Sequence, residues 1–262
     1  MGGSDSKDEI KPEGLISVII PVYNSVAFIK DTLDSIADQT VKMDIEVIVV
    51  DDGSADGTRE TVTEYSKRAE FSVRLLDNTN KKSAAGARNT GIDAAAGDYI
   101  AFIDADDKWL PDKLEKQIAL MQREKAAFSF TAYEFADEEC RGIGKIAHVP
   151  EKIGYREAVK NTIIFTSTVI LDMKILSKED IYFPYIASED SANWWKILKK
   201  IGNASGLDEP LTLYRRSGKT LSSNKLVGIK RIWGLYMNEG FSIPYSLYCF
   251  ICFAFNAVKR RI

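Results

Sequence analysis

The stretch "GDYIAFIDADDKWLP", residues 97 to 111, decides the fold. Within it, an apolar run at residues 99 to 103 leads directly into three carboxylates, Asp104, Asp106 and Asp107. A short apolar run of this kind predicts a buried strand. The three carboxylates repel one another and stabilise nothing by themselves. We therefore expect a bound cation, or a ligand that arrives with one, at the end of that strand.

Around this stretch, the first half of the chain alternates short apolar runs with helical patterns. We expect strands at residues 15 to 20, 45 to 50, 73 to 76 and 99 to 103, and helices at residues 26 to 38, 56 to 69 and 84 to 96. This alternation predicts an α/β fold, a mostly parallel, Rossmann-like sheet with helices on both faces. Ligands of such sheets bind beyond the carboxyl ends of the strands.

Polar residues stand at three of those strand ends, in "PVYN", "DDGS" and "DADD". A helix cap explains Asp56 in "DDGSADG", but it does not explain Asp51 and Asp52 together. An aspartate at a strand end can accept a hydrogen bond from a base or a ribose hydroxyl, so this pattern indicates a nucleotide site. An EF-hand is excluded, because Thr63 occupies the twelfth position and a strand precedes the loop.

The chain lacks a glycine-rich phosphate loop of either the GxGxxG or the GxxxxGK[ST] kind. The sequence therefore lacks the motifs that usually indicate a nicotinamide enzyme or a P-loop enzyme. A divalent metal that bridges Asp106 and the diphosphate oxygens would hold a nucleotide diphosphate instead. Arg88, in "GARNTG", would add a second positive group; the alternative for Arg88 is a surface residue at the start of a helix.

The composition is that of a soluble globular protein, with 45% apolar and 28% charged residues among 262. The net charge of -3 argues against nucleic-acid binding. Residues 211 to 262, however, contain nine Lys and Arg and a single acid, Glu239, which gives +8 there and -11 elsewhere. The three cysteines cannot form a disulfide framework, so they favour a reducing compartment. The CxxC of Cys249 and Cys252 lies in an apolar run and predicts packing, not metal binding.

The second half is less regular. We expect helices at residues 114 to 124, 191 to 201, 229 to 238 and 243 to 258, strands in "AAFSFTAYEF" and "TIIFTSTVIL", and a polar loop in "KTLSSNK". Residues 1 to 14 have no apolar core like that of a secretory signal, so they predict a disordered leader.

Five motifs resemble family 2 glycosyltransferases with the GT-A fold: "SVIIPVYN", "VIVVDDGSADGT", "AGARNTGI", "FIDADDKWLPDKL" and "SEDSANWWKIL". The resemblance covers residues 15 to 216, with residues 15 to 110 as the half that binds the nucleotide sugar and residues 111 to 216 as the half that binds the acceptor. It implies a divalent metal, Mn²⁺ or Mg²⁺, and a UDP-sugar donor. The residues that it places at the donor are Pro21, Tyr23, Asp52, Arg88, Asp104, Ala105 and Asp106, with Asp106 and Asp104 on the metal.

By the same resemblance, Asp190 in "SED" is the catalytic base. The chemistry agrees, because inverting sugar transfer needs one carboxylate to take the proton of the incoming hydroxyl. An acid just before a helix at residue 191 could also be its N-cap, and one of the pair Glu189 and Asp190 could serve so. We expect Glu189 to contact or support the acceptor. Trp194 and Trp195 could form a platform for the acceptor sugar, although at least one of them could belong to the core.

Two departures from the family pattern bear on the activity. The family often has a glycine where Ser83 and Ala84 stand, which leaves the path of that loop open. The QxxRW motif of processive members is missing, since "KRIW" lacks the glutamine, so we expect one sugar per binding event. The segment "YRRSGKTLSSNK" resembles bacterial capsule and lipopolysaccharide glycosyltransferases.

Residues 217 to 262 are expected to form a helical extension. Within it, "IPYSLYCFICFAFNAVKRRI" is too short an apolar run to span a bilayer and ends in three basic residues. It predicts that residues 241 to 262 contact the membrane surface peripherally, at the cytoplasmic face, with Lys259, Arg260 and Arg261 on anionic lipid. Packing on the body or in an oligomer is the alternative, and the oligomeric state stays open.

Together these features predict an inverting, metal-dependent transfer of one sugar to a lipid-linked or polysaccharide acceptor in cell-surface glycan biosynthesis. A sugar nucleotidyltransferase is one alternative, but that class carries a basic glycine-rich loop after the first strand, where this chain has "PVYN". A nucleotide-binding partner protein without catalysis is the other alternative.

Overall fold

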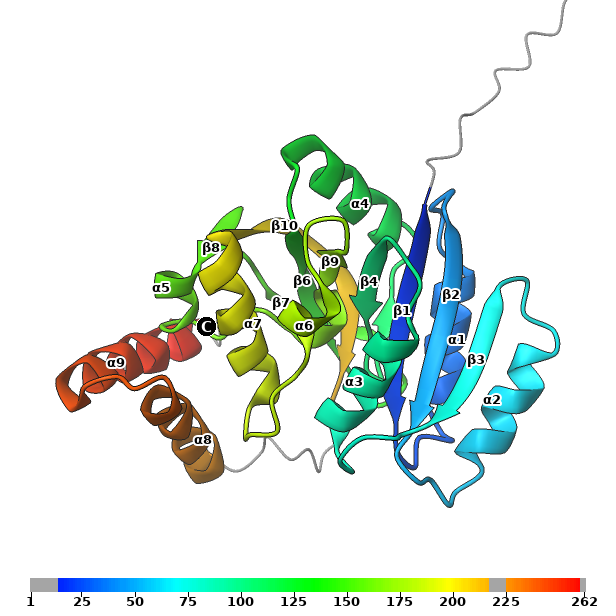
Figure 1. Ribbon diagram of the computed structural model, residues 1–262, viewed down its shortest axis with the longest axis horizontal. Helices are drawn as coiled ribbons and strands as arrows, with labels where there is room; N and C mark the ends of the chain where they lie inside the picture. Colours follow the sequence, from blue (N-terminus) through cyan, green and yellow to red (C-terminus); the bar gives the residue numbers. More distant parts are fainter. Residues whose placement is uncertain (1–13, 217–224, 260–262) are drawn as a thin grey trace, which may run out of the picture.

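A computed structural model describes residues 14–216 and 225–259 of the chain. Figure 1 shows one central sheet with helices on both faces, as the α/β expectation requires. Of the leader expected at residues 1 to 14, only Gly14 lies within the described part. The polar loop expected in "KTLSSNK" lies outside it except for Lys225.

The first half confirms the predicted alternation. Its strands are β1 (Leu15–Val22), β2 (Asp44–Asp51), β3 (Ser72–Asp77) and β4 (Tyr99–Phe102), and its helices are α1 (Ile29–Ala37), α2 (Thr58–Ser66) and α3 (Ala84–Ala94). The four strands run parallel in the order β3-β2-β1-β4. Because β1 and β2 are nearly continuous runs of buried residues, both faces of this half need a helical cover, which α1 and α2 supply on one side and α3 on the other.

The second half extends the same sheet through β9, β6, β10 and β5. Its strands are β5 (Lys108–Trp109), β6 (Phe128–Ala136), β7 (Gly142–Ala147), β8 (Lys152–Gly154), β9 (Ile170–Asp172) and β10 (Asn203–Arg215). Its helices are α4 (Lys113–Glu124), α5 (Tyr155–Ala158), the 3-10 turn η1 (Thr166–Thr168), α6 (Lys178–Ile181), α7 (Glu189–Ile201), α8 (Lys225–Asn238) and α9 (Ile243–Lys259). Strand β9 is antiparallel to β4 and β6, whereas β6 and β10 are parallel, so the sheet is mixed.

The strand predicted over "TIIFTSTVIL" is wrong for most of its length. The segment contains the 3-10 turn Thr166–Thr168, and only Ile170 and Leu171 join the sheet, in β9. The Ser167 hydroxyl accepts a hydrogen bond from the Asp104 backbone and donates to the Asp107 carboxylate. Those bonds draw the chain toward the carboxylate turn, away from an extended course.

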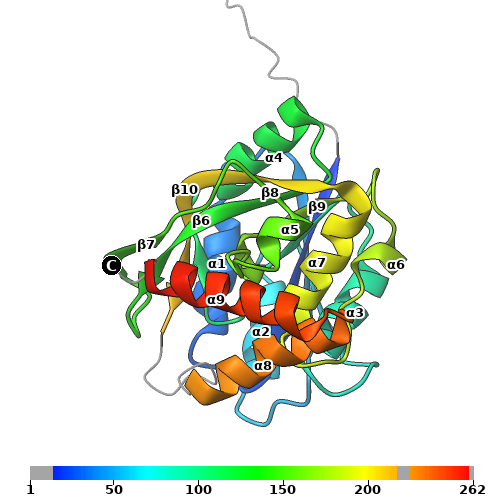
Figure 2. The ribbon, with the colours of Figure 1, turned by 90° about the vertical axis from the view of Figure 1, so that its left-hand side faces the viewer.

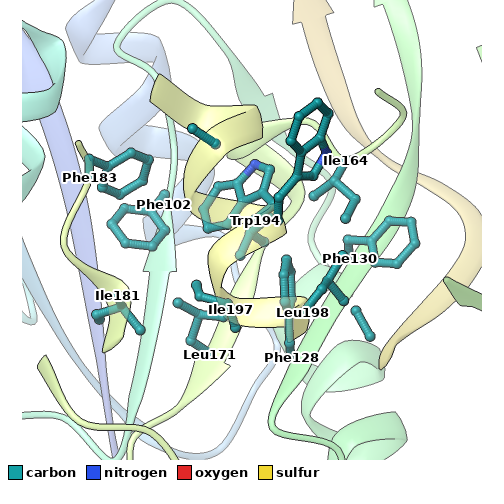
Figure 3. Close-up of a cluster of buried hydrophobic side chains, with 14 of the residues drawn as sticks. Phe102, Phe128, Phe130, Ile164, Leu171, Ile181, Phe183, Trp194, Ile197 and Leu198 are labelled. Atoms are coloured by element: carbon teal, nitrogen blue, oxygen red, sulfur yellow. The ribbon is translucent and has the colours of Figure 1, made fainter. Parts of the chain in front are cut away.

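A large apolar cluster holds the second half of the sheet to α7 (Figure 3). The Trp194 ring lies 5.4 Å from the ring centres of both Phe128 and Phe183, and 6.2 Å from that of Phe102. Figure 3 shows these rings converging from β4, β6, α7 and, for Phe183, the segment between α6 and α7. The cluster therefore fixes α7, and with it the "SED" segment at the start of that helix, against the sheet.

Helices α8 and α9 form a pair at the opposite end of the molecule from α2 (Figure 1), and α9 crosses in front of α5 in Figure 2. Tyr236 stacks on Trp195 with ring centres 5.9 Å apart, and its hydroxyl donates to the Val159 carbonyl at 2.8 Å. Cys249 is fully buried and Cys252 partly so, both as free thiols, in agreement with a packing role. No helix in the described ranges is long and apolar enough to cross a bilayer.

The close contact between α3 and β1 gives a test of the packing. A Cβ on Gly91 would lie 2.4 Å from Cγ2 of Ile19 in the centre of β1, so Gly91→Ala must push the two elements apart. We expect this variant to lose about 1–3 kcal/mol of unfolding free energy, measured by urea denaturation. Gly234→Ala in α8, where a Cβ meets nothing within 4 Å, is the control and should lose no stability. Equal denaturation midpoints for Gly91→Ala and the native protein would contradict this packing.

Candidate active site

The carboxyl ends of β1, β2 and β4 lie side by side in the sheet, because the three strands are parallel neighbours. Tyr23, Asp52 and Asp104 follow these ends, so the fold brings the three polar segments to one edge, as the sequence predicted. Pro21 lies just inside this edge, near the end of β1, and is partly exposed. The edge is therefore the candidate site.

The two aspartates after β2 have different roles. Asp51 is 3% exposed and accepts hydrogen bonds from the Ser54 N–H and from Arg59. Burial alone raises the pKa of Asp51, but these hydrogen bonds outweigh burial and leave the pKa below its usual value. Asp51 thus holds the turn. Asp52 is partly exposed, and Nδ2 of Asn78 donates to its Oδ1 at 2.6 Å, which orients the carboxylate.

The Tyr23 ring is the most exposed aromatic group of this edge, with 57% of its surface accessible. The Lys82 ammonium lies 5.5 Å from the ring centre. An exposed ring next to an oriented carboxylate can stack on a base while the carboxylate accepts a hydrogen bond. The structure also gives the path of the loop at Ser83 and Ala84, which the sequence left open. Ser83 caps α3, and its side chain accepts a hydrogen bond from the Gly86 N–H at 3.1 Å.

Buried hydrogen bonds hold the carboxylate turn after β4. The Thr32 hydroxyl donates to the carbonyls of Ala105 and Asp107, both at 2.8 Å. Asp107 is fully buried and accepts from the Ser167 hydroxyl and, at 3.2 Å, from the Arg215 N–H. Arg215 is itself buried, and its Nε donates to the Asp106 carbonyl at 2.7 Å. Burial, together with Asp104 and Asp106, raises the pKa of Asp107 well above its usual value. Asp107 is thus part of the scaffold of the turn.

Asp106 is the carboxylate of this turn that suits a cation best. It is partly exposed, and burial followed by the negative charge of Asp104 raises its pKa to about 6. A divalent cation would relieve this repulsion and favour the ionised form. Among the residues that the structure describes, no group of three His, Cys, Asp or Glu side chains could enclose a metal. Asp106, with Asp104 beside it, fits an open site that leaves most positions to water and diphosphate oxygens.

Arg88 joins the two halves of the site. It is 5% exposed, and its guanidinium donates to Asp104 at 2.7 Å and to Glu189 at 3.3 Å. Burial alone lowers the pKa of Arg88, but the charges of Asp104 and Glu189 outweigh burial and raise it. The alternative of a surface residue is therefore wrong.

Asp190 lies in the first turn of α7, partly exposed, and its Oδ1 accepts the Ser191 N–H at 2.7 Å. Burial, with the neighbouring charge of Glu189, raises the pKa of Asp190. The N-cap role is wrong for both acids, because the helix begins at Glu189 and its cap residue is Ser188, which adopts φ 56°. A left-handed residue other than glycine is strained, and such strain often accompanies functional sites.

The two tryptophans are not a sugar platform. Trp194 and Trp195 are each 2% exposed, Trp194 among the core phenylalanines and Trp195 against Tyr236. The period of α7 turns both rings inward, which makes this part of the acceptor prediction wrong. Ala105 is also buried, within the carboxylate turn, and its contact with a donor stays a prediction.

The residues that hold the site together were missing from the sequence analysis. Asn78, Thr32 and Ser167 are small polar residues without a motif, and they reach their partners only after the chain folds. Arg215 stands in the "YRRSG" segment, but nothing in that segment indicates a bond to a turn 109 positions away.

Comparisons with known proteins show which proteins this chain resembles. The family model for glycosyl transferase family 2 matches residues 17–180. A Bacillus subtilis (strain 168) protein provisionally named a teichuronic acid biosynthesis glycosyltransferase, TuaG, is 40% identical over 250 residues, which cover 95% of this chain and 98% of TuaG. WfgD of Escherichia coli, a UDP-Glc:alpha-D-GlcNAc-diphosphoundecaprenol beta-1,3-glucosyltransferase, is 38% identical over 84% of each chain.

Solved structures show the same fold. Staphylococcus aureus TarS 1–349 in complex with UDP-GlcNAc superposes with a TM-score of 0.66 and 22% identity, over 91% of this chain and 71% of TarS. The mannosyltransferase PcManGT of Pyrobaculum calidifontis, in complex with GDP-Man and Mn²⁺, superposes with a TM-score of 0.67 and 19% identity, over 94% and 74%.

Proposed function

This chain belongs to glycosyl transferase family 2, and from that membership we propose that it transfers one sugar from a UDP-sugar to a lipid-linked glycan, with inversion at the anomeric carbon. The main support for the proposal is the pair of ion pairs that Arg88 makes. The buried Arg88 guanidinium contacts both Asp104, on the donor side, and Glu189, which stands next to Asp190. The lipid-linked acceptor is suggested by WfgD, whose acceptor is a diphosphoundecaprenol sugar.

The donor lies along the edge formed by β1, β2 and β4. The Tyr23 ring stacks on the base, Pro21 borders it, and the oriented Asp52 carboxylate accepts a hydrogen bond from the nucleoside. Asp106 and Asp104 would hold a divalent metal, Mn²⁺ or Mg²⁺, which when bound stabilises the charge of the leaving diphosphate. Arg88 keeps Asp104 in place for that task.

Asp190 acts at the acceptor. Its carboxylate takes the proton of the acceptor hydroxyl as that oxygen forms a bond to the anomeric carbon. The bond from the anomeric carbon to the diphosphate oxygen breaks on the opposite face, and UDP leaves with the bonding electrons. The raised pKa of Asp190 makes it a stronger base than an ordinary aspartate, while Glu189 stays paired with Arg88.

The two alternatives differ in what they predict for donors. A sugar nucleotidyltransferase would release pyrophosphate from a nucleoside triphosphate and a sugar phosphate. A binding protein without catalysis would hold UDP but would neither hydrolyse nor transfer. A panel of nucleotide sugars, assayed for release of nucleoside diphosphate, separates sugar transfer from both alternatives and identifies the sugar. An assay for pyrophosphate release from a nucleoside triphosphate and a sugar phosphate then separates the two alternatives from each other.

A peripheral membrane contact through residues 241 to 262, at the cytoplasmic face, belongs to the same proposal. The exposed face of α9 is apolar, and four residues at a spacing of four are 51–70% exposed: Ile243, Leu247, Ile251 and Phe255. Lys160 lies next to this helix, with its ammonium 5.1 Å from the centre of the Tyr248 ring. An apolar face next to a basic group suits an anionic lipid surface.

Removal of one charge tests the metal carboxylate. Asp106→Asn should abolish the increase in UDP affinity that Mn²⁺ produces, measured by titration calorimetry with and without Mn²⁺, because the amide no longer offers a charged ligand. The protein should stay folded, since no core packing is lost. Asp38→Asn, at an exposed position, is the control. Undiminished dependence on Mn²⁺ in Asp106→Asn would show that another group binds the metal.

Removal of the base tests the chemistry. Asp190→Asn should retain UDP affinity but lower turnover roughly 10²- to 10⁴-fold, the usual loss for a general base. In the native protein, turnover should fall as the pH drops through the raised pKa of Asp190, since only the ionised form accepts the proton. If Glu189→Gln loses turnover to this extent and Asp190→Asn does not, the base is Glu189.

Point substitutions on α9 test the membrane contact. The double variant Ile251→Glu with Phe255→Glu should release the protein from phosphatidylglycerol vesicles in a sedimentation assay, because two charges replace exposed apolar groups. High salt should partly release the native protein. Ile143→Glu with Ile175→Glu, at sites 56% and 51% exposed outside α9, is the matched control because it also adds two charges. Equal vesicle binding by the double variant and the control would exclude this face of α9. Deletion of residues 241 to 262 is a poorer test, since it removes the buried Cys249.

A further inference from the structure

Four aromatic rings gather where β6 and β10 end: Tyr133, Phe135, Phe165 and Tyr214. Both Tyr133 and Tyr214 contact the other three rings, with ring centres 4.6–6.0 Å apart, and Phe165 lies closest to Tyr214. All four residues are only partly buried, unlike the rings around Trp194. Apolar surface left exposed in one cluster is unusual and often marks a binding site. We call this set the aromatic platform.

The platform borders the carboxylate turn. Tyr214 directly precedes Arg215, whose Nε donates to the Asp106 carbonyl at 2.7 Å. Phe165 lies two residues before Ser167, whose hydroxyl accepts the Asp104 N–H at 3.0 Å. In the sheet order, the nucleoside edge at β1 and β2 lies on one side of β4, and β6 and β10 lie on the other. The platform therefore occupies the side away from the nucleoside.

Two cations lie over the platform. The Arg216 guanidinium is 5.4 Å and the Lys145 ammonium 5.6 Å from the centre of the Phe135 ring. Within residues 14–216 and 225–259, neither cation has a carboxylate at ion-pair distance. Two cations without a carboxylate partner among the described residues, next to partly buried rings, suit a ligand that combines an apolar face with an anionic group.

We infer that the aromatic platform binds the acceptor as a glycosyl diphosphate, with its sugar ring on the aromatic faces and its diphosphate on Arg216 and Lys145. The C–H face of a sugar packs on aromatic rings, and the diphosphate supplies a counter-charge for the two cations, which meet no carboxylate in the part of the chain that the structure describes. This inference rests on the proposed function and deepens it. It gives the acceptor a platform in place of the buried Trp194 and Trp195.

Titration calorimetry on the full chain tests the inference with two probes, UDP with Mn²⁺ and a GlcNAc-α-diphosphate carrying a short alkyl chain. Phe135→Leu, which keeps the position apolar, and Arg216→Gln should each bind the glycosyl diphosphate roughly three- to tenfold more weakly, the range for one aromatic or charged contact. Neither should change the affinity for UDP by as much. Phe71→Leu and Arg123→Gln, outside the site, are the matched controls.

The outcomes separate this inference from the proposed function. If the native protein does not bind the glycosyl diphosphate, or if both platform variants bind it as tightly as the native protein, the inference is wrong. An equal loss for both probes would place the platform at the donor and would also overturn it. Failure of the native protein to bind UDP, with the glycosyl diphosphate bound and weakened by the variants, would contradict the proposed donor and leave the platform standing.

Discussion

The ion pairs of Arg88 with Asp104 and Glu189 are the constraint on which the rest of the site depends. Arg88 is buried on α3, and its two partners stand 16 and 101 positions further along the chain. Removing one partner of a buried ion pair leaves the other charges uncompensated, which is costly. The ion pairs therefore tie the start of α7 to the first half of the sheet, in addition to the aromatic cluster around Trp194. Together these contacts position Asp190, the proposed catalytic base.

The other aspartates of the site fall into two groups, buried and partly exposed. Asp51 and Asp107 are buried and bonded to backbone N–H groups and hydroxyls, so they shape turns. Asp52, Asp106 and Asp190 are partly exposed and keep oxygen atoms for a ligand. Such a site needs little rearrangement when the substrates bind, because folding has already fixed the charged groups in position.

Much of the fold could be predicted from the sequence, because apolar runs and helical periods are local signals. The parallel order of the first strands and the convergence of Tyr23, Asp52 and Asp104 followed from them. The signal fails where tertiary contacts override it. "TIIFTSTVIL" reads as a strand but turns at Ser167 to bond the carboxylate turn. The sequence left open whether Trp194 and Trp195 form a sugar platform or belong to the core, and the structure places both in the core, because the phase of α7 directs them inward.

The proposed mechanism needs only one carboxylate and one open metal site for a single displacement at the anomeric carbon. The most direct test is the anomeric configuration of the product, determined by NMR after transfer from UDP-glucose, or from whichever donor the panel identifies. A single displacement gives the new glycosidic bond the configuration opposite to that of the donor. Retention of the donor configuration would contradict it, because a single in-line displacement, with Asp190 as the base, inverts the anomeric carbon.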